Sequence, residues 1–159
     1  MHPALVPTTT SLGSTHGVLN GLFSVGNFVG PVFSQGPGAG REATASAVVA
    51  DLVDLANGRG LPVFGMPYAD LGTLVPGHMV DRVGRYYVRC GGGVDVETLT
   101  GHLAKAGVGV EAAVESACGG AAVVTAAVRE GEMFAASDAL YEVLDDSVFH
   151  KIIRVEGPW

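Results

Sequence analysis

The chain has 159 residues, of which 48% are hydrophobic, 16% are charged and 24 are glycine, and its formal net charge at pH 7 is −7. This apolar content is enough for one domain or two small ones and excludes an intrinsically disordered chain. Nine scattered Lys and Arg residues do not form the basic stripe that nucleic acid or an anionic membrane requires. The low charge predicts an apolar surface that is partly buried against a partner.

Cysteine and histidine spacing predicts no metal site. Cys90 and Cys118 lie far apart in the sequence, and neither belongs to a CxxC pair or has a histidine at metal-ligand spacing. Two reduced thiols in a cytoplasmic protein are therefore expected. No apolar run approaches the roughly 18 residues of a membrane helix, so no membrane partner is expected.

In chain order, residues 1–14 are rich in Pro and Thr and predict an irregular or edge segment. Two β-prone runs follow, at 15–25 and 28–35, and the pair Gly26-Asn27 between them suits a two-residue hairpin turn. Helical spacing then extends over 42–57, where an Asn-Gly pair predicts a C-terminal cap.

A glycine-rich turn, Gly36-Pro-Gly-Ala-Gly-Arg41, joins the second strand to this helix. The first N–H groups of a helix lack intrahelical acceptors and face the positive end of its dipole, so an anion can bind there. Glycine allows close approach to the backbone and a positive φ. The alternative is that these glycines only form the turn. The strict dinucleotide-binding fingerprint is absent, because Arg41 occupies the place of its last glycine.

Residues 59–83 show no sustained periodicity and predict a linker with one short helical turn near 68–74. From residue 84 the pattern is regular and predicts the order βαββαβ. Its elements are a strand at 85–90, a helix from the N-cap Asp95 to Gly107, a half-buried strand at 110–115, a turn at 118–121, a strand at 122–128, a helix at 134–145 with Val143 and Leu144 facing inward, and a strand at 148–156.

The predicted fold class is α+β, with a small β-hairpin-plus-helix segment followed by a ferredoxin-like βαββαβ domain. The predicted organisation has three parts, at 1–58, 59–83 and 84–159. Two strands and one helix cannot bury their apolar faces alone, so residues 1–58 need the rest of the chain or another copy.

Three early segments, His2-Pro-Ala-Leu-Val-Pro7, Gly17-Val-Leu-Asn20 and the glycine turn with its helix, resemble the last part of the catalytic region of homoserine dehydrogenase. The resemblance implies that a turn glycine, Gly40, contacts a nicotinamide cofactor, with Gly38 and Thr44 as neighbours. It also implies a homo-oligomer, most simply a dimer, because the corresponding strands of that family contribute to the subunit interface.

Residues 85–89, 105–111 and 153–156 make the last part of the chain similar to an ACT domain, the small-molecule regulatory module at the C-terminus of many homoserine dehydrogenases. This resemblance implies an amino-acid effector at the turn that holds Val94 and Asp95. The family's Asp-x-Pro-Gly turn is replaced here, and Val94 stands where its glycine would fall. A valine would crowd the effector, so a purely structural dimerisation role is the alternative.

The nucleotide-binding domain and catalytic lysine of the dehydrogenase family lie upstream of the region that the resemblance covers. The two lysines, Lys105 and Lys151, match no catalytic position. We therefore expect no catalytic residue in this chain and no cofactor bound by it alone, although NAD or NADP serves the complete enzyme.

The expected function is the C-terminal, regulatory portion of a homoserine dehydrogenase of threonine and methionine biosynthesis, active only with a separate nucleotide-binding domain. The alternatives are a stand-alone ACT-type amino-acid sensor and a structural dimerisation module. The sequence leaves open whether the chain is a truncated or a naturally short protein.

Overall fold

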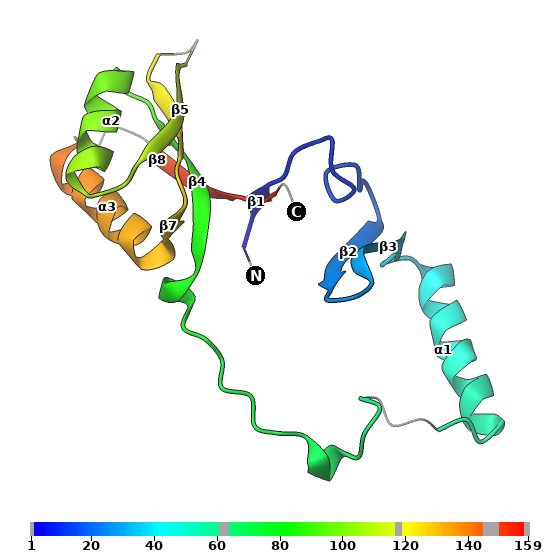
Figure 1. The fold of residues 1–159 in the computed structure, drawn as a ribbon. Helices are drawn as coiled ribbons and strands as arrows, with labels where there is room; N and C mark the ends of the chain where they lie inside the picture. The colour runs from blue at the N-terminus through cyan, green and yellow to red at the C-terminus, as the bar shows by residue number, and fades with distance from the viewer. Residues whose placement is uncertain (1, 61–63, 117–118, 145–149, 158–159) are drawn as a thin grey trace. The chain divides into compact units, whose positions relative to one another are not determined.

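The computed structural model describes residues 2–60, 64–116, 119–144 and 150–157 (Figure 1). The chain divides into two compact units. We call Met1–Pro7 together with Pro76–Trp159 the ferredoxin-like unit, and Thr8–Val75 the hairpin–helix unit. The chain thus passes between the units twice. The predicted division into three domains stays a prediction, but the two units place the first seven residues with the C-terminal part of the chain.

The hairpin–helix unit contains a two-stranded antiparallel sheet of β2 (Leu19–Gly26) and β3 (Gly30–Pro37), as predicted. The expected two-residue turn at Gly26-Asn27 is wrong. Gly26 pairs with Gly30, so the loop between the paired residues has three residues, 27–29. Gly30, the first residue after this loop, takes a left-handed conformation with φ 73°, which glycine adopts readily.

The predicted helix is confirmed as α1 (Arg41–Ala56). Its C-terminus is closed by Asn57, whose Nδ2 donates to Val53 O at 2.9 Å, and by Gly58 at φ 67°. No residue of α1 is buried, and its apolar side chains Val48, Leu52 and Leu55 are 53%, 59% and 72% exposed. The helix therefore has an apolar face that the described residues leave uncovered.

Two short 3-10 helices, η1 (Tyr68–Asp70) and η2 (Met79–Asp81), lie in the segment that was predicted to be a linker. The first confirms the helical turn expected near 68–74. The second belongs to the ferredoxin-like unit and packs against its last helix.

The ferredoxin-like unit has a sheet with the strand order β1-β8-β4-β6-β5. The predicted βαββαβ motif is confirmed. When its four main strands are numbered 1 to 4 in chain order, they lie side by side in the order 4-1-3-2, which is the ferredoxin-like arrangement. Its elements are β4 (Val83–Cys90), α2 (Val96–Lys105), β5 (Val110–Glu115), β6 (Ala121–Thr125), α3 (Glu130–Val143) and β8 (His150–Val155). The short β1 (Ala4–Leu5) adds a parallel edge beside β8, and β7 (Val128–Arg129) pairs with the start of β4.

Helices α2 and α3 cover one face of this sheet, and the core lies between them and the strands (Figure 1). Alternate residues of β4 point into the core while Tyr87 between them remains partly exposed, which is the period-two pattern of a half-buried strand. The largest fully buried side chains are Leu99, Leu103, Met133, Leu140, Val88, Val108, Val123, Thr125 and Cys90.

Three predictions about α3 and the strands that precede it need correction. Helix α3 begins at Glu130 rather than residue 134, because the Glu130 N–H donates to Arg82 O at 2.7 Å and two acidic residues in the first turn favour the helix dipole. Val143 is exposed rather than inward. The expected strand at 122–128 is divided into β6 and β7.

Strand β5 was expected to be half-buried, yet Val114 is 61% exposed. Strand β5 lies at the edge of the sheet, and its pairing with β6 shifts register between Val110 and Ala112. Because of this shift, alternate residues of the sequence do not all lie on the same face of the sheet. Cys118, the end of the predicted helix at 145 and the start of the predicted strand at 148–149 lie outside the described residues.

Candidate functional site

The glycine turn places Gly40 at the N-cap of α1 with φ 119° and ψ 145°. No side chain caps this helix end. A Cβ built on Gly40 would meet nothing within 4 Å, so glycine is needed for its backbone conformation and not to avoid a clash. The turn therefore presents an open helix N-terminus, the arrangement that favours an anion.

An open cavity of about 580 Å³ lies at this helix end. Its lining residues are Pro37, Ala39, Gly40, Arg41, Glu42 and Ala43. Of the three residues predicted to bind a cofactor, the cavity is lined by Gly40 alone. The other two, Gly38 and Thr44, lie on either side of it in the sequence.

Gly38 has a different role from Gly40. A Cβ on Gly38 would lie 1.6 Å from the Asn20 Nδ2, and the Gly38 N–H donates to Val18 O at 3.0 Å. The chain thus turns directly over the start of β2. Thr44 is exposed, and its N–H donates to Gly40 O at 3.0 Å to close the first turn of α1. The cofactor-binding roles of these three residues remain predictions.

The second predicted site, Val94 and Asp95, lies in the turn that precedes α2. Gly92 and Gly93 take positive φ values of 68° and 82°. Val94 is buried in the core of the ferredoxin-like unit. Asp95 Oδ1 accepts the Thr98 N–H at 2.7 Å, which makes Asp95 the N-cap of α2.

The hydrogen bonds from Thr98 lower the pKa of the Asp95 carboxyl below its ordinary value, because they stabilise the ionised form. Both residues thus have a structural task, packing for Val94 and capping for Asp95. Effector binding at this turn stays a prediction.

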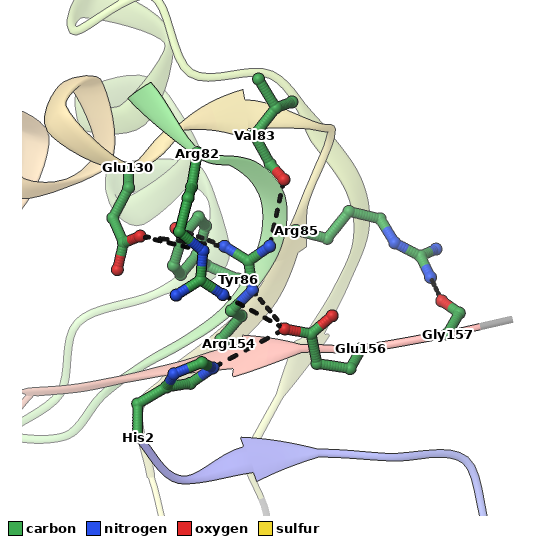
Figure 2. Close-up of polar contacts among 9 residues, drawn as sticks. All are labelled: His2, Arg82, Val83, Arg85, Tyr86, Glu130, Arg154, Glu156 and Gly157. Atoms are coloured by element: carbon green, nitrogen blue, oxygen red, sulfur yellow. Dashed lines mark hydrogen bonds and ion pairs between the residues drawn. The ribbon is translucent and has the colours of Figure 1, made fainter. Parts of the chain in front are cut away.

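A cluster of acidic and basic side chains in the ferredoxin-like unit, which we call the ionic cluster, was not predicted from the sequence (Figure 2). Glu156 is at its centre. Its Oε1 lies 3.6 Å from His2 Nε2 and 3.7 Å from Arg82 Nη2, and it also accepts a hydrogen bond from Arg154 Nε. Three basic groups from distant parts of the sequence therefore meet at one carboxylate oxygen.

Arg154 is the most deeply placed arginine of the cluster, and its side chain is 10% exposed. Its Nη1 donates to the Tyr86 hydroxyl at 3.2 Å and its Nη2 to Val83 O at 3.1 Å. A Cβ on Gly84 would come within 2.6 Å of the guanidinium, so glycine leaves the room that Arg154 occupies. Burial, followed by the charge of Glu130, raises the pKa of Tyr86.

Glu130 is the second carboxylate of the cluster. Its Oε2 lies 3.8 Å from Arg82 Nε and 4.0 Å from Arg154 Nη1, and it is buried without a hydrogen bond to any described residue. An open pocket of about 200 Å³ borders it, lined by His2, Pro3, Tyr86, Glu130, Phe134, Ile152, Ile153 and Arg154. The sequence signal that could have indicated this cluster was Arg154 in a predicted strand. An arginine that becomes buried in a fold needs carboxylate partners.

Within the described residues, no group of three or more His, Cys, Asp or Glu side chains is arranged to hold a metal ion. None of the helices in that part of the chain combines the length and the apolar character needed to cross a membrane.

Comparison with known proteins finds similarity to homoserine dehydrogenases. The family model for homoserine dehydrogenase matches residues 1–53. The homoserine dehydrogenase of Synechocystis sp. is 31% identical over 173 aligned positions, which include 98% of this chain and 39% of that protein. The homoserine dehydrogenase of Pseudomonas aeruginosa is 46% identical over 55 positions, 35% of this chain and 13% of that protein.

Solved structures give the same result. A homoserine dehydrogenase from Thiobacillus denitrificans superposes with a TM-score of 0.75 and 28% identity over 98% of this chain and 38% of its own. The homoserine dehydrogenase of S. aureus at pH 7.0, at 19% identity and a TM-score of 0.62, shares the fold. The chain spans about two fifths of the length of the Synechocystis and Thiobacillus proteins. The chain is therefore similar in sequence and in fold to the C-terminal part of homoserine dehydrogenases.

Proposed function

We propose that these 159 residues close the catalytic region of a homoserine dehydrogenase and add a regulatory unit of the ACT type to it. The complete enzyme would interconvert homoserine and aspartate semialdehyde with NAD or NADP, in the cytoplasm and on the route to threonine and methionine. The observation that carries the proposal is the similarity to the Synechocystis enzyme, which extends over 98% of this chain.

The glycine turn is the part of this chain that we assign to the cofactor. Gly40 lines an open cavity, and no atom lies within 4 Å of the position of a Cβ, so a planar ring or a phosphate can approach the backbone there. Arg41 lines the same cavity and adds a positive charge. When bound, NAD or NADP would accept the hydride from homoserine. This chain would contribute the backbone surface against which the cofactor rests.

By this proposal the chain does not oxidise homoserine alone, because proton transfer at the substrate and most of the cofactor platform belong to other parts of the enzyme. The test is a spectrophotometric assay of NAD- and NADP-dependent homoserine oxidation. The pure chain should be inactive, and adding a separately expressed nucleotide-binding part of a homoserine dehydrogenase should produce activity. Oxidation of homoserine by the 159-residue chain alone would contradict the proposal.

Assembly is a second role, which the uncovered apolar surface of the hairpin–helix unit favours. Besides the face of α1, the hairpin exposes Leu22 at 67% and Phe28 at 97%. Exposed apolar patches of this kind mark interfaces. We propose that they are covered in a homo-oligomer, most simply a dimer, or by the nucleotide-binding domain. Sedimentation equilibrium of the pure chain would distinguish a dimer from a monomer.

Effector binding is tested separately, by calorimetric titration with threonine, isoleucine, methionine and lysine at millimolar concentration. Heat from one amino acid would support a regulatory unit. A flat titration of a stable dimer would leave the ferredoxin-like unit with an assembly role only.

A further inference from the structure

The ferredoxin-like unit is joined to the hairpin–helix unit at two places in the sequence. One is the segment 2–7, which contains β1 and which we call the N-terminal connection. The other is the segment 76–82, which contains η2 and which we call the linker connection. Both are covalent routes by which a change in one unit can reach the other.

Each connection packs on the rest of the ferredoxin-like unit. Strand β1 pairs with β8 at two positions, and its Leu5 O accepts the Glu156 N–H at 2.9 Å. The linker connection packs through Val80 against Gly131, where a Cβ would meet the Val80 Cβ at 3.2 Å. Its Arg82 O accepts the Glu130 N–H.

The Glu156 side chain contacts both connections. Its Oε1 lies 3.6 Å from His2 of the N-terminal connection and 3.7 Å from Arg82 of the linker connection (Figure 2). Arg154 donates a hydrogen bond to this carboxylate and also donates to the Tyr86 hydroxyl and the Val83 carbonyl, which fix its own position. The position of the Glu156 carboxylate is therefore fixed, and the same oxygen contacts both connections.

We propose that Glu156 is a junction that couples the two connections, so that loosening one of them loosens the other. The coupling follows from the shared oxygen. If His2 leaves, the carboxylate loses one of the groups that orient it, and Arg82 then interacts with a less ordered partner. Its value to a homoserine dehydrogenase, transmission between a regulatory and a catalytic unit, rests on the function proposed above, whereas the coupling itself does not.

The test is residue-specific amide hydrogen exchange of the full chain, measured by NMR. The Glu156 N–H reports on the N-terminal connection, and the Glu130 N–H reports on the linker connection. Glu156→Gln keeps the shape of the side chain and removes its charge, and we expect the protection of both amides to fall by about fivefold or more. The matched control is Glu115→Gln, which removes an exposed carboxylate at the end of β5 and should change neither amide by more than about twofold.

A second pair of variants tests the coupling. His2→Ala should lower the protection of the Glu130 N–H, although His2 does not contact Glu130, and this effect should disappear in the Glu156→Gln background. The proposal is overturned if Glu156→Gln affects one connection only, or if His2→Ala leaves the Glu130 N–H unchanged. It is also overturned if the amides of Leu99 and Leu103 in α2 lose protection by the same factor, since Glu156 would then contribute to global stability alone. None of these measurements depends on dehydrogenase activity, so the proposed function can fail while the coupling stands.

Discussion

Gly38 and Asn20 meet where the glycine turn passes over the start of β2, so closely that a Cβ on Gly38 would lie 1.6 Å from Asn20 Nδ2. Two residues further on, a Cβ on Gly40 would meet nothing within 4 Å. Two glycines of one motif are thus required for different reasons. Gly38 permits close packing, and Gly40 permits a positive φ.

Gly38→Ala should displace the Asn20 side chain and destabilise the hairpin–helix unit by about 1 kcal/mol or less, because both residues are exposed and the Asn20 side chain can turn into solvent. Truncation of the neighbour in Asn20→Ala should recover part of that loss, because it removes the atoms that the new methyl would meet. The measurement is urea unfolding of the four chains of the double-mutant cycle. An unchanged penalty in the Asn20→Ala background would show that the packing contact is not its cause.

Leu103→Ala should reduce the free energy of unfolding of the ferredoxin-like unit by about 2–5 kcal/mol, because it leaves a cavity between α2 and the sheet. Val143→Ala is the matched control at an exposed position of α3, and its effect should stay within about 0.5 kcal/mol. Urea unfolding of the two variants, followed by circular dichroism at about 222 nm to monitor helix content, measures the difference. Equal effects would contradict the position of the core.

The sequence predicted the elements of this unit well because its strongest signals are local. Asp95 before an apolar helix and Gly107 after it determine α2, and the alternation along β4 determines which of Tyr86 and Tyr87 is buried. The prediction failed where a residue distant in the sequence determines the local structure. The start of α3 depends on a hydrogen bond from Glu130 to Arg82, and the exposure of Val114 depends on its place in an edge strand after a register shift.

The candidate sites show the same limit. The glycine motif indicates a helix N-terminus, but it does not reveal that Gly38 packs on Asn20 while Gly40 is open. The ionic cluster was missed because its members come from distant parts of the sequence, and only the fold brings His2 to Glu156.

Asp95→Ala should shorten α2 from its N-terminus and lower the urea midpoint, whereas Asp95→Asn should retain most of the stability because Asn is an equally good N-cap. The pH dependence gives an independent check. The folded-state pKa of Asp95 is lowered from its ordinary 3.8, so its contribution is present above that value and is lost as the pH falls through the lower, folded pKa. The wild-type chain should lose more stability than Asp95→Asn between about pH 5 and pH 2. Parallel acid profiles of the two chains would contradict this assignment.

Tyr86→Phe should preserve the packing of the ring and remove the hydroxyl that accepts from Arg154, at a cost of about 1–2 kcal/mol near neutral pH. The pKa of Tyr86 is raised by burial first and by Glu130 second. A group with a raised pKa stabilises the fold below its unfolded value of 10.0, and this contribution is lost as the pH rises through the folded pKa. The stability difference between wild type and Tyr86→Phe should therefore shrink above about pH 10, as urea unfolding at pH 8 and pH 10.5 would measure. A difference that grows with pH would contradict the sign.

Gly40→Ala should impair the cofactor-dependent reaction of a reconstituted enzyme, because the backbone at φ 119° is strained by any side chain and the new methyl projects into the space assigned to the cofactor. Gly36→Ala is the matched control, since a Cβ there also meets nothing within 4 Å and Gly36 does not take a positive φ. We expect the KM for the cofactor to rise about tenfold or more in Gly40→Ala and to change less than about twofold in Gly36→Ala, with circular dichroism showing that both chains fold. A change in kcat without a change in KM for the cofactor would place Gly40 outside the cofactor contact. Equal effects of the two substitutions would instead show that the turn as a whole, and not the open backbone at residue 40, determines activity.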